Sequence, residues 1–151
     1  MSITLHDLIY YPRTIGLFAN GVFTGLGICM NFVSVPSIKA TNDPLPVFYK
    51  TYSRASKIAI LNIAVSTVCN AICYYRTSKI NFLYASVLSF ASAPFTLIFI
   101  APINNQLFEM EKQGSSYDRK KVYALINKWD RLQYFRTISG TAAFILNLLY
   151  H

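Results

Sequence analysis

Two small groups of polar and aromatic residues stand where long apolar segments meet charged ones. Trp129, Leu132 and Arg136 fall at positions i, i+3 and i+7, so a helix would carry them on one stripe. Asn104 and Asn105 form an adjacent amide pair. A guanidinium stabilises an anion, an indole stacks on a flat ring, and amides donate hydrogen bonds to developing negative charge on oxygen. The candidate site residues are therefore Arg136, Trp129, Asn104 and Asn105.

Each of these side chains also has a purely structural interpretation. Arg136 could reach toward lipid headgroups, and Trp129 could anchor a helix at the membrane interface. Asn104 and Asn105 could cap the end of a helix. A proton-transfer reaction would also need a base, and no spacing in the sequence selects one. Asp130 lies about 100° around the helix from Trp129 and could point away from the site, and Glu109, Glu111 and His6 are candidates only by elimination.

The cysteines of the sequence form no recognisable metal-binding motif. All three, Cys29, Cys69 and Cys73, lie in apolar segments and form no Cys-x-x-Cys motif or Cys/His cluster. Cys69 and Cys73 are one helical turn apart and would share a face. Buried thiols that behave as small apolar side chains are the simplest interpretation. A redox or metal-binding pair is the alternative.

Composition favours a membrane protein. Charged residues make up 13% of the 151 residues, about half of what a soluble domain carries. The mean hydropathy is +0.36. The net charge of +8 comes from basic residues confined to the segments between apolar runs. This distribution is typical of loops that flank membrane spans, and we expect no nucleic-acid partner.

Four apolar segments predict an all-α fold, an integral membrane four-helix bundle with antiparallel up-and-down topology. The single domain covers residues 1–151, with spans at about 14–36, 58–75, 80–102 and 132–150. We expect Asp43–Pro46 to form a turn that resists helix. Pro94 should kink the third span, and Pro102 should end it. The segment 109–121 should be a flexible loop, followed by a fourth helix that begins outside the membrane.

The lysines and arginines predict an orientation. The loops 37–57 and 103–131, with Arg136, hold eleven of them, whereas the other side holds three. The positive-inside rule then places these loops in the cytoplasm and both termini in a lumen or outside. We expect the membrane to be an endomembrane such as the endoplasmic reticulum. The lipid bilayer is the expected partner. Gly21 and Gly25 form a G-x-x-x-G motif that would pack this helix on a neighbour, or on a partner protein or second copy.

The order of several motifs resembles the fungal anthrone oxygenase-like family of small four-helix membrane proteins. The similarity covers essentially the whole chain and is most specific between Pro94 and Arg136. The family often has Asn where this chain has Gln133. The motifs are Val35-Pro36, Tyr52/Arg54/Lys57, Pro94/Thr96, Asn104-Asn105/Leu107 and Trp129/Leu132/Arg136.

This resemblance implies oxidation of an anthrone to an anthraquinone by O₂, without metal or flavin. An anthrone has an acidic methylene between two aryl rings, and its anion can pass an electron to O₂. Arg136 would stabilise the oxyanion, Trp129 would stack on the ring, and Asn104 and Asn105 would donate to oxygen. The alternative is a non-enzymatic membrane protein, either an accessory subunit or a module that binds lipids or hydrophobic small molecules.

Overall fold

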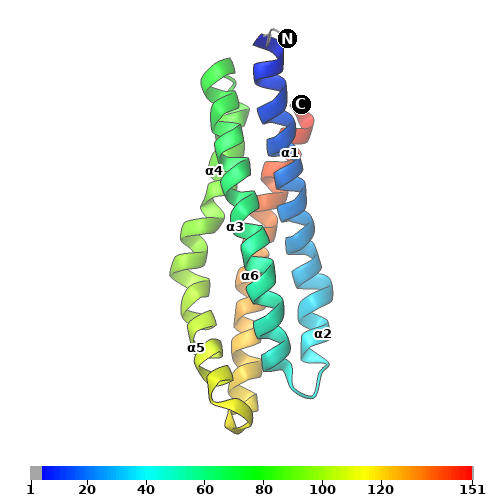
Figure 1. Ribbon diagram of the computed structural model, residues 1–151, viewed down its shortest axis with the longest axis vertical. Helices are drawn as coiled ribbons and strands as arrows, with labels where there is room; N and C mark the ends of the chain where they lie inside the picture. Colours follow the sequence, from blue (N-terminus) through cyan, green and yellow to red (C-terminus); the bar gives the residue numbers. More distant parts are fainter. Residues whose placement is uncertain (1–4, 151) are drawn as a thin grey trace.

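Four long helical rods make up the molecule (Figure 1). The computed structural model describes the backbone of residues 5–150 and the side chains of residues 11–114 and 116–150. The first rod is α1 (Leu5–Cys29), the π-helical turn η1 (Met30–Ser34) and α2 (Val35–Lys39), and the second is α3 (Pro44–Thr77). The third is α4 (Ile80–Phe95), the π-helical turn η2 (Thr96–Ile100) and α5 (Ala101–Lys112). After the short η3 (Gly114–Ser116), α6 (Arg119–Leu149) forms the fourth.

The rods form an antiparallel bundle. α1 packs against α3 and α6, and α4 packs against the same two helices, so consecutive rods are neighbours. Figure 1 shows the α3–α4 turn at the same end as the two chain termini, with α2 and α5 at the other end. The predicted all-α four-helix bundle, with a long fourth helix, is confirmed.

Three of the rods are long and apolar enough to cross a membrane: Tyr11–Lys39, Pro44–Thr77 and Ile80–Lys112. These three rods support the prediction that the protein is an integral membrane protein. α6 does not reach the same apolarity, because its sequence from Leu132 onward contains Gln133, Arg136 and Asn147, all of them buried in the bundle. The fourth span, the orientation and the identity of the membrane stay predictions.

Two expectations about proline were wrong. Asp43–Pro46 does not resist helix, because Pro44 is the first residue of α3 and a proline in the first turn loses no helical hydrogen bond. Pro102 does not end the third rod, which continues as α5 to Lys112. The π-helical turns η1 and η2 end two residues before Pro36 and Pro102 respectively, so each widened turn accommodates the proline that follows it.

The loop predicted at 109–121 is also shorter than expected. Its first residues belong to α5, and α6 begins at Arg119. The carboxylate of Asp118 accepts hydrogen bonds from the backbone amides of Lys120 and Lys121, which caps the new helix. The chain therefore folds back within a few residues, and this closes the end of the bundle around α5 and α6.

Small residues bring α1 close to α6. A Cβ atom on Gly27 would meet the hydroxyl of Thr137 at 2.8 Å, and one on Gly140 would meet the ring of Phe23 at 2.6 Å. Gly21 faces Phe144 of α6, whereas a Cβ on Gly25 would meet nothing within 4 Å. One glycine of the G-x-x-x-G motif thus packs inside the bundle. The motif's role in association with another chain stays a prediction.

Candidate functional site

Arg136 lies inside the bundle, with 6% of its surface exposed. One guanidinium nitrogen donates to the Oε1 of Gln133, one turn earlier on α6, at 3.0 Å. The guanidinium also lies 5.7 Å from the centre of the Phe23 ring of α1, a cation–π contact. Within the part of the chain that the structure describes, Arg136 forms no ion pair. The sequence-based alternative, an arginine that reaches the headgroups, does not agree with this burial.

Trp129 is in the core, not at an interface, with 1% of its surface exposed. Its ring makes edge-to-face contacts with Phe48 at 5.3 Å and with Tyr52 at 5.9 Å, both on α3. Phe48 and Tyr52 stack on each other at 6.0 Å. The position of Tyr52 is therefore fixed by aromatic rings on its own helix and on α6.

The two adjacent asparagines have different environments. Asn104 on α5 is buried, and its side chain lies beside the hydroxyl of Tyr52 and interacts with it. The Oδ1 of Asn104 is buried and has no hydrogen-bond partner among the described residues. Asn105 is exposed. The structure thus brings Asn104, Trp129 and Arg136 together around Tyr52 and leaves Asn105 outside.

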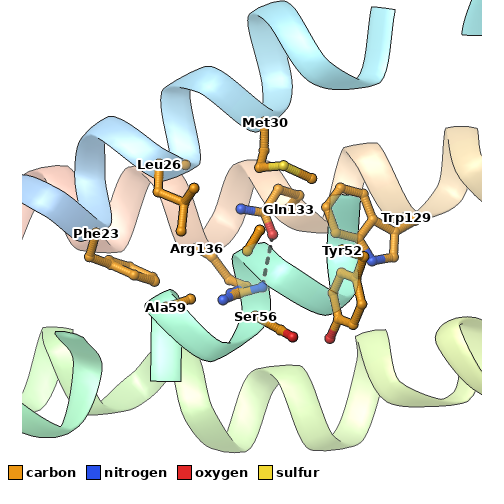
Figure 2. A pocket seen from close by; sticks show the side chains of 11 residues that line it. Phe23, Leu26, Met30, Tyr52, Ser56, Ala59, Trp129, Gln133 and Arg136 are labelled. Carbon is orange, nitrogen blue, oxygen red and sulfur yellow. Dashed lines mark hydrogen bonds between the residues drawn. The ribbon is translucent and has the colours of Figure 1, made fainter. Parts of the chain in front are cut away.

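Two hollows meet at Arg136. The smaller, of about 20 Å³, lies among α1, α3 and α6. Figure 2 shows its side chains, with the guanidinium of Arg136, the hydroxyl of Ser56 and the phenol oxygen of Tyr52 turned toward the α4–α5 rod. The larger, of about 290 Å³, is a groove between α3 and the α4–η2 segment. Tyr52, Ser56 and Arg136 line both hollows.

The groove opens on the apolar outer surface. Its edges include Ile60, Phe90 and Leu97, whose side chains are more than half exposed. Its inner wall is formed by small or apolar residues such as Ala93 and Ile63, and its inner end by Arg136. A flat apolar molecule could therefore enter from the side, from lipid, and reach the guanidinium.

Unpaired donors stand beside these hollows. Burial of a polar atom without a partner is costly, and such atoms in native proteins call for an explanation such as a ligand or a water molecule. Among the buried side-chain atoms without a hydrogen bond, three belong to residues that line the hollows: Thr67 Oγ1, Trp129 Nε1 and Arg136 Nε. Two of them are N–H donors, the indole of Trp129 and the guanidinium of Arg136 itself, and both residues line the smaller hollow, which is an arrangement suited to an oxyanion.

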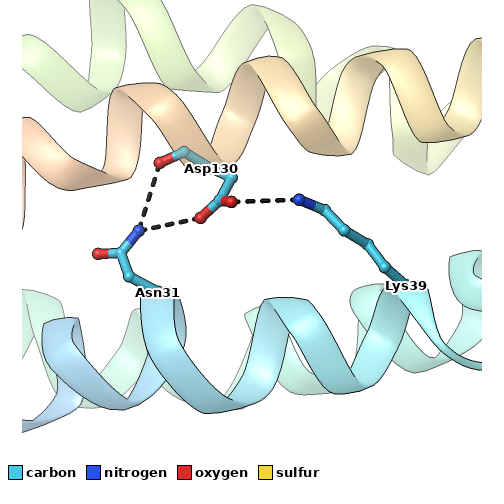
Figure 3. A network of polar contacts seen from close by, with 3 residues as sticks. All are labelled: Asn31, Lys39 and Asp130. Carbon is cyan, nitrogen blue, oxygen red and sulfur yellow. Dashed lines mark hydrogen bonds and ion pairs between the residues drawn. The ribbon is translucent and has the colours of Figure 1, made fainter.

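The described acidic residues considered as a base face elsewhere. Figure 3 shows Asp130 between Asn31, whose amide donates to it at 3.0 Å, and Lys39, which forms an ion pair with it at 3.2 Å. Glu109 pairs with Lys112 at 2.8 Å on the surface, and Glu111 is not among the residues that line either hollow. His6 lies outside the described side chains.

The remaining described acids are occupied at the closed end of the bundle. Asp118 caps α6, and Asp43 accepts a hydrogen bond from the hydroxyl of Tyr117. Burial and this hydrogen bond raise the pKa of Tyr117 to about 12. No described carboxylate lines either hollow.

The Asn31 amide connects this polar network to the site. Its Oδ1 accepts a hydrogen bond from the hydroxyl of Thr137 at 2.6 Å, while its Nδ2 donates to Asp130. Thr137 follows Arg136 directly, and Asp130 follows Trp129. Asn31, in η1, therefore fixes the rotation of α6, which determines where Trp129 and Arg136 point.

A family model described as anthrone oxygenase matches residues 48–146. The chain belongs to the anthrone oxygenase family. This range contains Tyr52, Asn104, Trp129 and Arg136, and the resemblance seen in the sequence is confirmed. An anthrone oxygenase of Cryptosporiopsis sp. (strain 8999) is 26% identical over 137 residues, which cover 85% of this chain and 79% of that protein.

A second relative is an anthrone oxygenase of Aspergillus fumigatus, which is 25% identical over 140 residues, or 88% of this chain and 86% of that protein. No solved structure matches the chain significantly. Family membership indicates an oxidoreductase of the monooxygenase type.

Sequence reasoning did not assign Tyr52, Gln133 or Phe23 to the site. Tyr52 and Gln133 entered only as parts of the family pattern, and Phe23 only as one apolar residue of a span. Their relation to Arg136 depends on contacts between α1, α3 and α6. The sequence did contain one indication of Tyr52. This tyrosine follows Phe48 and Tyr49 closely and stands just before the second apolar run.

The three cysteines form no disulfide with one another. All three are free thiols; Cys73 is buried, Cys69 half-buried and Cys29 exposed. Among the described residues, no group of three metal-ligating side chains gathers in one place.

Proposed function

We propose that this protein oxidises a flat, phenolic, anthrone-like substrate with O₂ in the groove between α3 and the α4–η2 segment, without metal or flavin. One observation carries the proposal. Arg136, with 6% of its surface exposed and no carboxylate partner in the described chain, stands at the inner end of an apolar groove. Such a cation favours binding of an anion that is itself lipophilic, and the enolate of an anthrone is one.

The size and lining of the groove support a small ring system. Its volume of about 290 Å³ is near the lower limit of ligand pockets, about 300 Å³. Its walls come from apolar and small side chains, and its mouth lies on the lipid-facing surface beside Leu97. A polycyclic aromatic ketone would partition into lipid first and enter sideways.

The chemistry balances without a further oxidant. The substrate methylene loses a proton, and the electron pair spreads over the rings to the carbonyl oxygen, which Arg136 stabilises as an enolate. O₂ takes an electron and then bonds to the former methylene carbon, which gives a peroxide. Loss of water turns that carbon into the second carbonyl of the quinone. One oxygen atom of O₂ enters the product, and the other leaves in water.

The same groove favours a second candidate function, binding of a hydrophobic molecule without turnover. Its opening toward lipid is the specific observation, because Ile60 and Leu97 at the mouth are exposed apolar side chains. A binding protein would bind an anthrone and its quinone alike, and it would leave the spontaneous oxidation rate unchanged.

The test uses purified protein in lipid nanodiscs, an anthrone and O₂, with the quinone absorbance as the readout. Empty nanodiscs give the spontaneous rate. Ala93→Phe places a ring in the groove and should abolish the excess rate. Val87→Phe, on the exposed side of the same helix, is the matched control and should retain it. An oxidation rate equal to that of empty nanodiscs, with tight anthrone binding, would establish the second candidate instead.

A further inference from the structure

We propose that Tyr52 is the catalytic residue that accepts the proton from the substrate methylene. This inference rests on the proposed function and supplies the base that the sequence did not reveal. Tyr52 is the one ionisable oxygen acid that lines both hollows among the described side chains. It shares these hollows with Arg136, the residue that would hold the resulting oxyanion.

Aromatic rings and a neighbouring amide hold the phenol of Tyr52 in one place. Its ring is clamped between Trp129 at 5.9 Å and Phe108 at 5.8 Å, and it stacks on Phe48. The amide side chain of Asn104 on α5 lies beside the phenol oxygen, and an amide nitrogen carries two N–H donors. The hydroxyl of Ser56, one helical turn later on α3, lines the same hollows.

The charges around Tyr52 come from a single side. Arg136 on α6 is the charged group that shares its hollows and interacts with it electrostatically. The lining contributed by α1 (Phe23, Leu26, Gly27 and Met30) carries no charge, and neither does the lining from α4 and η2. The nearest acid in the α6 sequence, Asp130, is engaged with Lys39 and Asn31. A phenolate at Tyr52 therefore has a cationic neighbour and no anionic one in the described lining.

The proton returns to complete the cycle. The Tyr52 phenolate takes the methylene proton, which leaves the substrate enolate with its oxygen at Arg136 and Tyr52 as the neutral phenol. After O₂ has added to the carbon, the phenol gives this proton to the peroxide anion. The hydroperoxide then loses water to form the quinone, and Tyr52 is a phenolate again. Anthrone plus O₂ thus gives quinone plus water, and the protein is unchanged.

Tyr52→Phe removes the proton acceptor and keeps the ring that packs against Trp129. Tyr49→Phe is the matched control, because Tyr49 lies one turn earlier on α3, is 38% exposed and packs on Phe108 outside the hollows. General-base removal typically lowers a rate by about 10²–10⁴-fold. We expect a loss of this size for Tyr52→Phe and wild-type activity for Tyr49→Phe.

Two readouts separate proton transfer from oxidation. The first is exchange of the methylene protons for deuterium in D₂O without O₂, followed by NMR; the second is quinone formation with O₂. Both should fall together in Tyr52→Phe. In the wild type both should rise with pH as the phenol ionises. A 3-fluorotyrosine at position 52, which packs as tyrosine does but is more acidic, should shift this rise to lower pH.

Each alternative outcome has a distinct meaning. A Tyr52→Phe protein that exchanges protons at the wild-type rate, or a fluorotyrosine protein with an unmoved pH profile, would overturn the role of Tyr52 while the proposed function stands. A wild-type protein that forms no quinone above the empty nanodiscs would overturn the proposed function itself. The fluorotyrosine protein also covers the case in which Tyr52→Phe does not fold.

Discussion

Replacement of Arg136 by methionine should abolish oxidation and leave the fold intact. The guanidinium stands where negative charge would develop on the substrate, so its loss removes transition-state stabilisation. Removal of one such donor typically lowers kcat by about 10²–10³-fold, which corresponds to about 3–4 kcal/mol. Methionine has a similar length and is apolar, so it fills the same space beside Phe23.

The effect of this substitution on stability should be small, because two terms oppose each other. Gln133 loses the partner of its buried Oε1, which costs about 1–3 kcal/mol. The bundle no longer has to hold a buried charge without a carboxylate partner, and apolar replacement of buried ionic groups gains about 1–4 kcal/mol. We therefore expect the thermal unfolding midpoint in detergent to move by less than about 6 °C.

The assay combines quinone formation with an unfolding scan of the same sample. Arg131→Met, at an exposed position of the same helix, is the control and should retain activity. A fall in kcat of less than about tenfold in Arg136→Met would refute the oxyanion role. A large fall in the unfolding midpoint would show instead that the guanidinium mainly stabilises the fold.

Two further substitutions test how the bundle positions the site. Gly140→Ala should destabilise the protein by about 1–3 kcal/mol in thermal unfolding, because its Cβ would lie 2.6 Å from the ring of Phe23, whereas Gly25→Ala, with no neighbour within 4 Å, should leave the midpoint unchanged or raise it. Equal midpoints for the two would contradict this packing. Asp130→Asn should cost less than about 1 kcal/mol and leave quinone formation intact, since its partly buried ion pair with Lys39 faces away from the hollows and the amide oxygen can still accept from Asn31. A folded but inactive Asp130→Asn protein would indicate that the Asp130 carboxylate acts as the base.

The four-helix fold could be predicted from the sequence, because a chain of long uncharged runs separated by short charged segments can form few structures other than a bundle of membrane helices. The ends of the helices could not. Pro102 has the local chemistry of a helix breaker, but the π-helical turn η2 before it absorbs the disruption, and the rod continues. Pro44 likewise stands in a segment that looks like a turn and instead starts a helix.

The candidate site could be predicted only in part. The spacing of Trp129 and Arg136 was sufficient to place both on one stripe of α6, and their burial together agrees with it. Asn104 and Asn105 are indistinguishable in sequence, and only the rotation of α5 against α3 turns the first toward Tyr52. The phenol itself was missed because its significance depends on partners from two other helices.

The measurement that tests the central claim most directly is isotope labelling with ¹⁸O₂. Purified protein in nanodiscs, treated with a metal chelator and freed of small molecules, is given an anthrone under ¹⁸O₂, and the quinone is analysed by mass spectrometry. We predict quinone formation well above the rate in empty nanodiscs, one ¹⁸O atom per quinone, and one O₂ consumed per quinone. A rate equal to that of empty nanodiscs, or a quinone whose new oxygen comes from water, would contradict it.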